Sequence, residues 1–321
     1  MKDIRIIVAG LSPSLDRTIT LESYLPGKTN IIKNTVTRAG GKATNVSFAL
    51  KKFGMDFVSA GIIAGSNGEY IKKALEDKGI DTVFSHIEGE TRVNYKIYCE
   101  NTKTMTEMND RGQPIAAEDA EDWTESMINM LGGCETLVLS GRLPPGFSGD
   151  TYARIIAAAN RGNTKVILDT NGRSLKDSLG SKPYAVKPNR DELEEYAGRR
   201  LPSIKETAEV LRGIIDRGVS IAVVSLGKDG AIGADRDQML YAESFDIIPA
   251  GTVGAGDSMV AALVYCLHNH MCFQDTLKWM VAYSTLTAAM GPGEYPGMEE
   301  AENALKYIKV KENFINSLQY L

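Results

Sequence analysis

Short runs of valine, isoleucine and leucine alternate along the chain with longer segments in which apolar residues recur at helical spacing. The short runs are typical of buried strands, which we predict at residues 4–9, 58–60, 136–140, 165–169, 184–186 and 221–225. The longer segments predict helices at residues 45–53, 68–78, 118–131, 151–161, 190–197 and 204–217. This alternation predicts an α/β fold in which helices cover both faces of a mostly parallel central sheet.

Two stretches, at about residues 12–38 and 90–110, show the period-two pattern of strands with no helix between the strands. They predict a small antiparallel β-sheet inserted into the α/β body, and such an insertion commonly forms a lid over a site at the carboxyl ends of the parallel strands. The sequence contains no low-complexity linker and no internal repeat, so we expect residues 1–321 to form a single domain that carries this lid. Helices are predicted to end the chain at residues 257–268, at 272–290 and between 299 and 321.

Composition and charge narrow the classes of protein that the chain can be. With 321 residues, 43% of them hydrophobic and 24% charged, and a net charge of −5, the chain lacks the basic field that holds nucleic acid or an anionic membrane. Its four cysteines form no Cys-x-x-Cys pair, which argues against a structural zinc site or a disulfide framework. The longest apolar run, residues 259–267, is too short to span a bilayer. We therefore expect a cytoplasmic protein without nucleic-acid or membrane partners.

The strongest local pattern is the run Gly-Thr-Val-Gly-Ala-Gly-Asp-Ser at residues 251–258, directly before an apolar helix. Small residues allow a tight turn and a close ligand approach, and the free N–H groups at a helix start bind anionic oxygen. With Asp257 in its rim, such an anion cradle suits phosphoryl transfer, because the carboxylate can accept the proton of an attacking hydroxyl. An aspartate at a helix start is also a common N-cap. The spacing alone leaves both interpretations of Asp257 open.

A second glycine-rich turn, Ala-Gly-Gly-Lys-Ala-Thr-Asn at residues 39–45, opens another predicted helix. It offers a polyhydroxy ligand its backbone, the amide of Asn45 and the positive charge of Lys42. The alternative is that Asn45 caps the helix and Lys42 faces solvent.

Two further turns can be explained by local structure alone, without a bound ligand. Residues 187–192, Lys-Pro-Asn-Arg-Asp-Glu, fit a strand end followed by a helix with a capping box. Residues 225–230 predict a turn between two strands. Neither a dinucleotide fingerprint nor a Walker A loop is present, since Met259 and Glu22 stand where those motifs require glycine.

Six motifs in a fixed order carry a resemblance to a known family. They are Leu-Ser-Pro-Ser-Leu-Asp-Arg at residues 11–17, Ala-Gly-Gly-Lys at 39–42, Ser-Gly-Arg-Leu-Pro-Pro-Gly at 140–146, and the runs at 187–192, 225–230 and 252–257. In this order the chain resembles the ribokinase-type (PfkB) carbohydrate kinases, specifically the 1-phosphofructokinase and tagatose-6-phosphate kinase branch. The resemblance extends from about residue 5 to residue 290. It implies a ribokinase-like three-layer sandwich with a β lid, and ATP, Mg²⁺ and a sugar phosphate as ligands, with K⁺ as a further cation.

The same resemblance implies roles for particular residues. Asp257 would be the catalytic base, and the backbone N–H groups of Val253, Gly254, Ala255, Gly256 and Asp257 would form the anion hole for the transferred phosphoryl group. On the nucleotide side, Glu192 would hold Mg²⁺ through water, and ATP would meet Lys187, Asn189, Ser225, Leu226, Gly227, Lys228, Asp229 and Gly230. On the sugar side, the expected contacts are Asp16, Gly40, Gly41, Lys42, Asn45, Arg92 and Arg142. Of these, Arg92 matches an arginine that reaches from the lid toward the existing phosphate of the sugar.

Three residues depart from the pattern of the branch: Ala43 replaces a glycine, Arg142 a serine and Asn171 another serine. Arg142 is either an extra phosphate clamp or a solvent-facing side chain. The expected reaction is the ATP-dependent phosphorylation of fructose 1-phosphate to fructose 1,6-bisphosphate, and tagatose 6-phosphate and fructose 6-phosphate are the alternative substrates. A different class, a nucleotide- or sugar-phosphate-binding sensor that has lost catalysis, would show a broken base or metal element. Edge strands of the lid could pair two chains into a homodimer.

Overall fold

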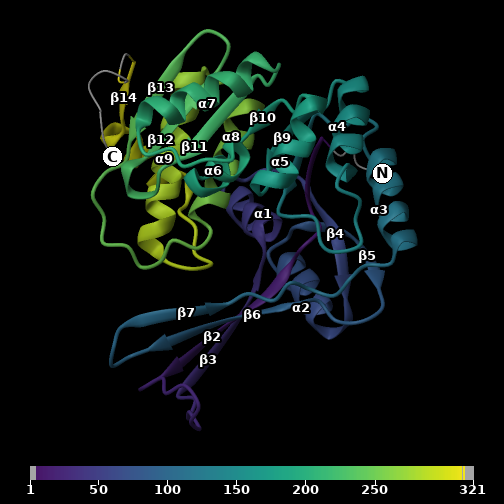
Figure 1. Ribbon diagram of the computed structural model, residues 1–321, viewed down its shortest axis with the longest axis vertical. Coiled ribbons are helices and arrows are strands. Elements are labelled where there is room, and N and C mark those ends of the chain that lie inside the picture. The colour runs from purple at the N-terminus through teal and green to yellow at the C-terminus, as the bar shows by residue number, and fades with distance from the viewer. Residues whose placement is uncertain (1–4, 313, 315–321) are drawn as a thin grey trace.

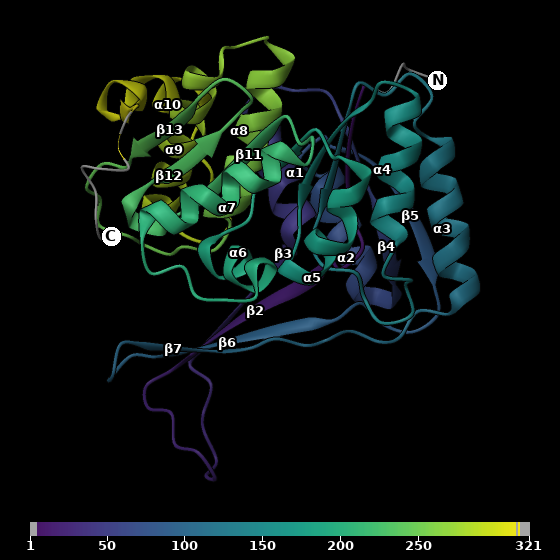
Figure 2. The same ribbon diagram turned by 45° about the horizontal axis from the view of Figure 1, so that its top comes forward.

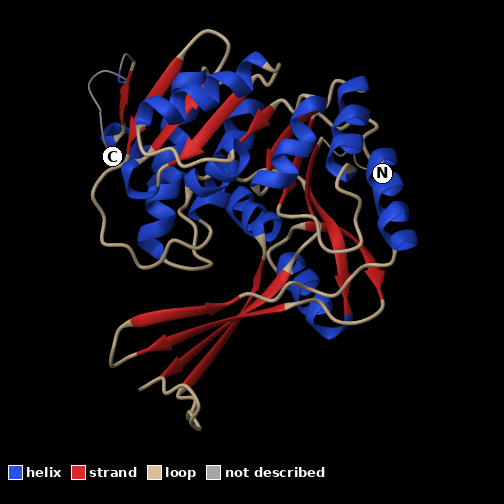
Figure 3. Ribbon diagram, viewed as in Figure 1, coloured by secondary structure: helices blue, strands red, loops and turns tan. Residues whose placement is uncertain are grey.

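The computed structural model describes residues 5–312 and residue 314. Its body is built on a sheet of ten described strands in the order β14-β13-β12-β11-β10-β9-β8-β1-β4-β5 (Figures 1 and 3). The seven strands from β11 to β5 are parallel, and the last three at the other edge are antiparallel. The parallel strands are β1 (Ile6–Gly10), β4 (Val58–Ala64), β5 (Asp81–Ile87), β8 (Thr136–Ser140), β9 (Lys165–Asp169), β10 (Ala185–Val186) and β11 (Ile221–Ser225). The antiparallel strands are β12 (Ala231–Ala234), β13 (Met239–Glu243) and β14 (Lys309–Lys311).

Two hydrophobic cores lie on opposite faces of this sheet, because alternate strand residues point to opposite sides. Within β1, for example, Ile6 and Val8 belong to one core, and Ile7 and Ala9 to the other. The first core is closed by α1 (Lys42–Lys52), α2 (Gly65–Glu76), α8 (Ala255–His268), α9 (Phe273–Met290) and α10 (Met298–Ala304). The second is closed by α3 (Ala117–Asn129), α4 (Thr151–Arg161), α5 (Gly172–Ser178), α6 (Arg190–Ala197) and α7 (Ile204–Asp216). The predicted three-layer α/β fold is therefore confirmed.

A second sheet, the lid, extends away from the body as a separate blade (Figures 1 and 2). It contains β2 (Ser14–Leu21), β3 (Asn34–Gly40), β6 (Val93–Cys99) and β7 (Thr104–Met108), in the order β3-β2-β6-β7. Its two outer pairs are antiparallel, as expected of hairpins, whereas the central pair of β2 and β6 is parallel. The chain crosses through the body between these two strands, and such a crossover permits parallel pairing.

The helix predicted between residues 299 and 321 is wrong for part of its length. The structure has only the two-turn α10 there, followed by a short helical turn and by β14, which pairs with β13. Charged residues at the alternating positions 309 and 311 frame Val310, a pattern that suits an edge strand better than a helix. Residue 313 and residues 315–321 of that prediction lie outside the described part of the chain.

The chain order of the strands fixes where a site can form. After β1 the chain passes through the lid strands β2 and β3 and through α1, and then returns as β4 on one side of β1, while β8 occupies the other side. At such a switch point the loops diverge above the carboxyl ends of the strands and leave a crevice. Ser140, Asp169 and Lys187 all stand at or just after these ends.

Candidate functional site

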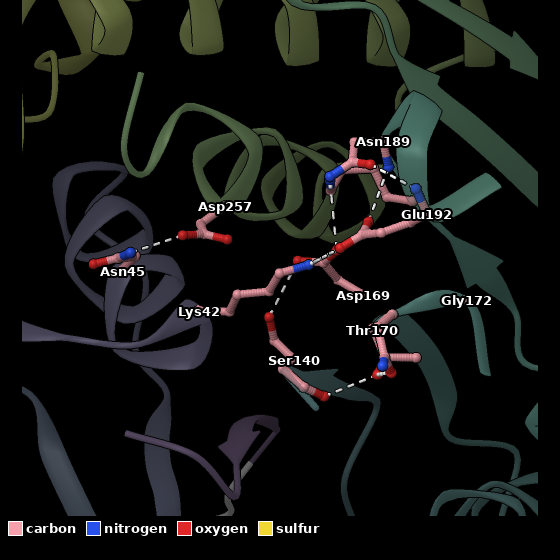
Figure 4. Close-up of polar contacts among 12 residues, drawn as sticks. Lys42, Asn45, Ser140, Asp169, Thr170, Gly172, Asn189, Glu192 and Asp257 are labelled. Atoms are coloured by element: carbon pink, nitrogen blue, oxygen red, sulfur yellow. Dashed lines mark hydrogen bonds and ion pairs between the residues drawn. The ribbon is translucent and has the colours of Figure 1, made fainter. Parts of the chain in front are cut away.

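Asp257 is buried near the start of α8, but it does not cap that helix. The N-cap is Gly254, whose φ of 86° puts it in the left-handed region that favours glycine, and Asp257 is the third helical residue. No side chain caps α8. The carboxylate instead turns across the site, and its Oδ2 accepts a hydrogen bond from Asn45 Nδ2 at 2.7 Å (Figure 4). The capping interpretation of Asp257 is therefore wrong.

Lys42 lies at the centre of a network of buried charges. Its Nζ donates to Asp169 Oδ1 at 3.1 Å and to Glu192 Oε1 at 2.8 Å, as the dashed lines in Figure 4 show. Lys187 Nζ lies 3.5 Å from the same Asp169 oxygen, and Ser140 Oγ donates to the other oxygen at 3.2 Å. Asp169 and Lys187 are almost completely buried, so each charge depends on the other for compensation. Lys42 does not simply face solvent.

This network changes the proton affinities of its members. Burial, and then the negative charge of Asp169, raise the pKa of Asp257 to about 6, although Lys42 and Asn45 act in the opposite direction. Burial also opposes the charge of Asp169, but Lys187 and Lys42 outweigh it and lower the pKa of Asp169. For Lys42, burial disfavours the charged amine, and the carboxylates of Asp169 and Glu192 nevertheless raise its pKa. Asp257 is therefore the carboxylate of this network that can exchange a proton near neutral pH.

One short segment, residues 40–45, touches every carboxylate of the site. Gly40 lies against Asp16, and a Cβ on Gly40 would stand 2.7 Å from the Asp16 carboxyl carbon. The helix α1 then begins directly after Gly41, with φ of 99°, which brings Lys42 and Asn45 onto the site. Asn45 is the fourth residue of α1 and not its cap, so the alternative that it only caps the helix is also wrong.

Three polar side chains of the lid strands hydrogen-bond to the carboxylate of Asp16. Its Oδ1 accepts hydrogen bonds from Ser14 Oγ and Asn94 Nδ2, both at 3.0 Å, and its Oδ2 accepts one from Lys96 Nζ at 3.0 Å. The strand register explains the grouping, since Asp16 in β2 lies opposite Asn94 in β6. Lys96 has a side chain only 9% exposed, so it is an internal partner of Asp16 and not a solvated lysine.

Arg92 and Arg142 approach each other next to these polar side chains, and Arg92 donates to Asn94 Oδ1 at 3.1 Å. Both donate to the carbonyl oxygen of Asp110, Arg92 at 2.9 Å and Arg142 at 3.1 Å, and Arg92 also donates to the carbonyl oxygen of Ser12 at 3.0 Å. Burial, followed by the positive charge of Arg142, lowers the pKa of Arg92. Two mutually repelling guanidinium groups held together by backbone carbonyls form a site that an anion would stabilise. Arg142 is therefore not simply a solvent-facing side chain.

At residues 187–192, the predicted capping box is confirmed. Asn189 Oδ1 accepts from the backbone N–H of Glu192 at 2.8 Å, and Glu192 Oε2 accepts from the backbone N–H of Asn189 at 2.9 Å. Asn189 also bridges to Ser225 at the end of β11, so the turn at 225–230 is tied to the start of α6. Within that turn, Gly227 and Gly230 have positive φ, and a Cβ on Gly230 would clash with the backbone of Ala242. The predicted strand-to-strand turn is confirmed.

The glycine turn before α8 lies close to these groups. A Cβ on Gly256 would stand 3.5 Å from Lys187 Nζ, so Lys187 points at the start of α8. The N–H of Ala255 already donates to the carbonyl oxygen of Thr252 at 3.2 Å. A helix start with a buried ammonium beside it can bind anionic oxygen.

The side-chain oxygens of the site determine whether it can bind a magnesium ion. No cluster of three or more histidine, cysteine or acidic side chains suited to a metal occurs among the described residues. Glu192, with a side chain 14% exposed, still offers a carboxylate at the start of α6. One carboxylate together with substrate phosphates and waters is a usual environment for Mg²⁺, so the residues present fit this ion.

The sequence patterns missed four polar residues of the site: Ser14, Asn94, Lys96 and Asp169. Asp169 carried a usable signal, since it is an acidic residue at the carboxyl end of an otherwise apolar strand. The other three belong to lid strands, where alternating polar residues look the same as a solvated face. Only the pairing of β2 with β6 distinguishes the two cases.

Ala43, one of the departures from the pattern, has a structural explanation. Its methyl group packs against Gly10, where a Cβ would come within 2.3 Å of the Cβ of Ala43. Because Gly10 has no side chain, there is room for the methyl group that Ala43 has in place of glycine.

A three-layer α/β body with a β lid next to the carboxyl edge of its sheet defines the class of sugar kinases to which this protein belongs. The chain is a member of the pfkB family of carbohydrate kinases, whose family model matches residues 9–291.

Individual relatives support the same family. The chain is 31% identical to the 1-phosphofructokinase of Bacillus subtilis over 95% of its own length and 99% of that protein. It is 30% identical to the tagatose-6-phosphate kinase of Staphylococcus epidermidis over 96% and 99% of the two chains. Among solved structures, phosphofructokinase-2 from Escherichia coli in complex with potassium matches with a TM-score of 0.88 and 25% identity, covering 95% of this chain and 99% of that one.

Proposed function

We propose that this carbohydrate kinase transfers the γ-phosphoryl group of ATP to the 6-hydroxyl of fructose 1-phosphate, giving fructose 1,6-bisphosphate and ADP. The observation that supports the reaction most is the segment at residues 40–45, which connects the lid pocket at Asp16 to the buried charges around Asp257. A polyhydroxy ligand held at Asp16 would thus reach toward Asp257. The similarity to named 1-phosphofructokinases over most of the chain supports fructose 1-phosphate as the substrate.

Asp257 is the general base in this proposal. Its Oδ2 is held by Asn45, which leaves Oδ1 to accept the proton of the attacking 6-hydroxyl. The new O–P bond forms on that hydroxyl oxygen, the bond from the γ-phosphorus to the bridging oxygen of ATP breaks, and the electron pair leaves with ADP. The N–H groups of Val253, Gly254, Gly256 and Asp257 bind the transferred group, with Lys187 beside them. Ala255 was expected in this set, but its N–H is already bonded to Thr252.

ATP binds along the carboxyl ends of β10 and β11 in this proposal. Lys187 lies near the phosphates, and Asn189 and the turn at 225–230 contact the nucleotide. Mg²⁺, held through water by Glu192, neutralises charge on the nucleotide phosphates when it is bound. Lys42, which pairs with Glu192 and Asp169, limits the repulsion among the carboxylates and the incoming phosphates. K⁺ is a further cation to test, since a similar solved structure contains potassium.

The sugar phosphate occupies the lid pocket. Its hydroxyls donate to Asp16, the backbone at Gly40 and Gly41 lines the same pocket, and the existing phosphate meets Arg92 and Arg142. The lid as a whole, inserted at about residues 12–38 and 90–110, belongs to a single kinase domain.

Exposed apolar side chains on the lid, among them Ile31 at 80% and Ile32 at 54%, favour pairing of two copies through their lids.

No described helix is long and apolar enough to cross a membrane. We propose a cytoplasmic location for the enzyme, and light scattering of the purified protein measures its assembly.

The experiment that tests the function is a coupled assay of ADP release. Fructose 1-phosphate, fructose 6-phosphate, tagatose 6-phosphate and unphosphorylated ketoses are compared at saturating ATP and Mg²⁺. We expect the highest kcat/KM with fructose 1-phosphate. Preference for tagatose 6-phosphate or fructose 6-phosphate would keep the mechanism and reject the substrate. Binding of a sugar phosphate without turnover of any acceptor would instead identify a catalytically silent sensor.

A further inference from the structure

The hydroxyl of Tyr295 is buried without a hydrogen-bond partner among the described residues. The side chain is only 3% exposed, and it lies in the loop between α9 and α10. A buried hydroxyl that makes no hydrogen bond costs free energy, so its persistence at one place in a well-packed core calls for an external partner.

This hydroxyl lies beside the glycine turn that begins α8. A Cβ on Gly254, the N-cap of α8, would stand 3.0 Å from Tyr295 Oη, so the hydroxyl faces the open side of that glycine. Burial raises the pKa of Tyr295 well above its usual value, and the carboxylates of Asp257 and Asp16 raise it further. Tyr295 is therefore a neutral O–H donor whose hydroxyl is influenced by the charges of both Asp257 and Asp16.

The loop that carries Tyr295 is held firmly against both the body and the lid. Tyr283 Oη lies 3.1 Å from the carbonyl oxygen of Pro296, the neighbour of Tyr295. A Cβ on Gly251 would come within 2.8 Å of Pro292, and a Cβ on Gly293 within 3.1 Å of Arg38 in the lid strand β3. The loop thus spans from the turn before α8 to the lid, which fixes Tyr295 between the two halves of the site.

We propose that Tyr295 is a substrate-binding residue whose hydroxyl donates a hydrogen bond to an oxygen of the bound sugar phosphate, beside the acceptor hydroxyl. This inference rests on the proposed function in that it takes a ketose phosphate as the ligand. The charges of the site favour this contact. In the proposed complex, hydroxyls of the sugar donate hydrogen bonds to the carboxylates of Asp16 and Asp257. A sugar oxygen between these carboxylates then needs a hydrogen-bond donor, and the hydroxyl of Tyr295 supplies one. The three atoms nearest to a Cβ placed on Gly254 all belong to the Tyr295 side chain.

The test is the variant Tyr295→Phe, which removes only the hydroxyl. We expect KM for the sugar phosphate to rise about 3- to 10-fold, the range for one neutral hydrogen bond, with KM for ATP unchanged. The thermal stabilisation of the free enzyme by fructose 1-phosphate, measured without ATP, should shrink in the same variant. The melting temperature of the ligand-free variant should be equal to or higher than that of the wild type, because the hydroxyl has no partner there.

Tyr283→Phe is the matched control. Its hydroxyl is equally buried but lies 3.1 Å from the carbonyl oxygens of both Ala49 and Pro296, so its loss should lower the melting temperature. An unchanged KM in Tyr295→Phe, or a fall in kcat at constant KM, would overturn the sugar contact. A lower melting temperature with unchanged KM would show a purely structural role.

The two proposals fail separately. If the wild type phosphorylates fructose 1-phosphate and Tyr295→Phe behaves identically, the function stands and the Tyr295 contact is wrong. If the wild type is stabilised by the sugar phosphate but turns over no ketose phosphate, while Tyr295→Phe is stabilised less, the contact stands and the function is wrong.

Discussion

Asn45 Nδ2 lies 2.7 Å from Asp257 Oδ2, a contact that joins the first turns of α1 and α8 (Figure 4). The amide occupies one carboxylate oxygen and thereby orients the other one. The same first turn of α1 also carries Lys42, which is bonded to Asp169 and Glu192. A single helix start therefore sets the direction of the proposed base and compensates the charges around it.

Asp257→Asn should lower kcat by about 10²- to 10⁴-fold, the contribution of a general base, and leave KM for ATP nearly unchanged. The amide oxygen of the variant can still accept from Asn45, so the fold should be retained. The melting temperature at neutral pH should not fall, because burial already disfavours the charged carboxylate. A coupled assay and a thermal melt measure both results, and turnover close to that of the wild type would eliminate Asp257 as the base.

Much of the body could be predicted from sequence. Strands buried on both faces, such as β8 and β9, have continuous apolar runs, and their predicted bounds are the observed ones. The helices α4 and α6 likewise begin and end as predicted, since Gly162 and Gly198 mark their ends. β14 could not be predicted, because a three-residue edge strand takes its pairing from β13, far away in the chain.

The site was less accessible to sequence reasoning. Local patterns left Asp257 and Asn45 open between capping and ligand binding, and the contact between them spans 212 residues. Tyr295 carried no signal at all, because a tyrosine in a glycine- and proline-rich loop looks like ordinary packing. What sets Tyr295 apart is that its hydroxyl has no hydrogen-bond partner among the described residues and lies beside Gly254. This arrangement arises only when two loops that are distant in sequence meet in the folded chain.

Activity should fall on the acidic side as Asp257 takes up a proton. Its pKa is raised to about 6, and a general base must be ionised, so kcat/KM should rise with pH through about 6 and level off above it. Phosphate groups of the substrates also titrate near pH 6. The wild-type profile alone therefore does not identify Asp257.

Two variants with opposite effects on the charge around Asp257 distinguish protonation of Asp257 from protonation of the substrate phosphates. Asp169→Asn removes a negative charge that raises the pKa of Asp257, so the acidic limb should move to lower pH. Lys42→Met removes a positive charge that lowers it, so the limb should move to higher pH. The pH profiles of kcat/KM measure both shifts. Titration of the substrate would leave the limb at the same pH in all three enzymes, and that result would rule out Asp257 as its origin.

Gly40→Ala should raise KM for the sugar phosphate by about 10-fold, because the added methyl would stand 2.7 Å from the Asp16 carboxyl carbon and displace the carboxylate from its lid partners. KM for ATP should be unaffected. Gly213→Ala in α7 is the control: nothing lies within 4 Å of its Cβ position, and the change should stabilise the helix by about 0.5–1 kcal/mol without altering KM. Equal KM values for Gly40→Ala and the wild type would remove Asp16 from the sugar pocket.

Glu192→Gln separates the proposed magnesium role of this residue from its structural one. The amide oxygen of glutamine can still accept from the backbone N–H of Asn189, so the capping box should be retained, and any fall in melting temperature reports the lost ion pair with Lys42. The negative charge is lost, and the Mg²⁺ concentration for half-maximal activity should rise about 10-fold or more.

Glu300→Gln is the matched control for this change, because Glu300 Oε2 accepts a hydrogen bond from the backbone N–H of Gly297 at the start of α10, as Glu192 Oε2 does from Asn189. It should leave the Mg²⁺ dependence unchanged. Titration of activity with Mg²⁺ at fixed ATP measures the effect. A Glu192→Gln enzyme with the wild-type Mg²⁺ requirement and a lowered melting temperature would show that Glu192 serves only the helix start and its ion pair with Lys42.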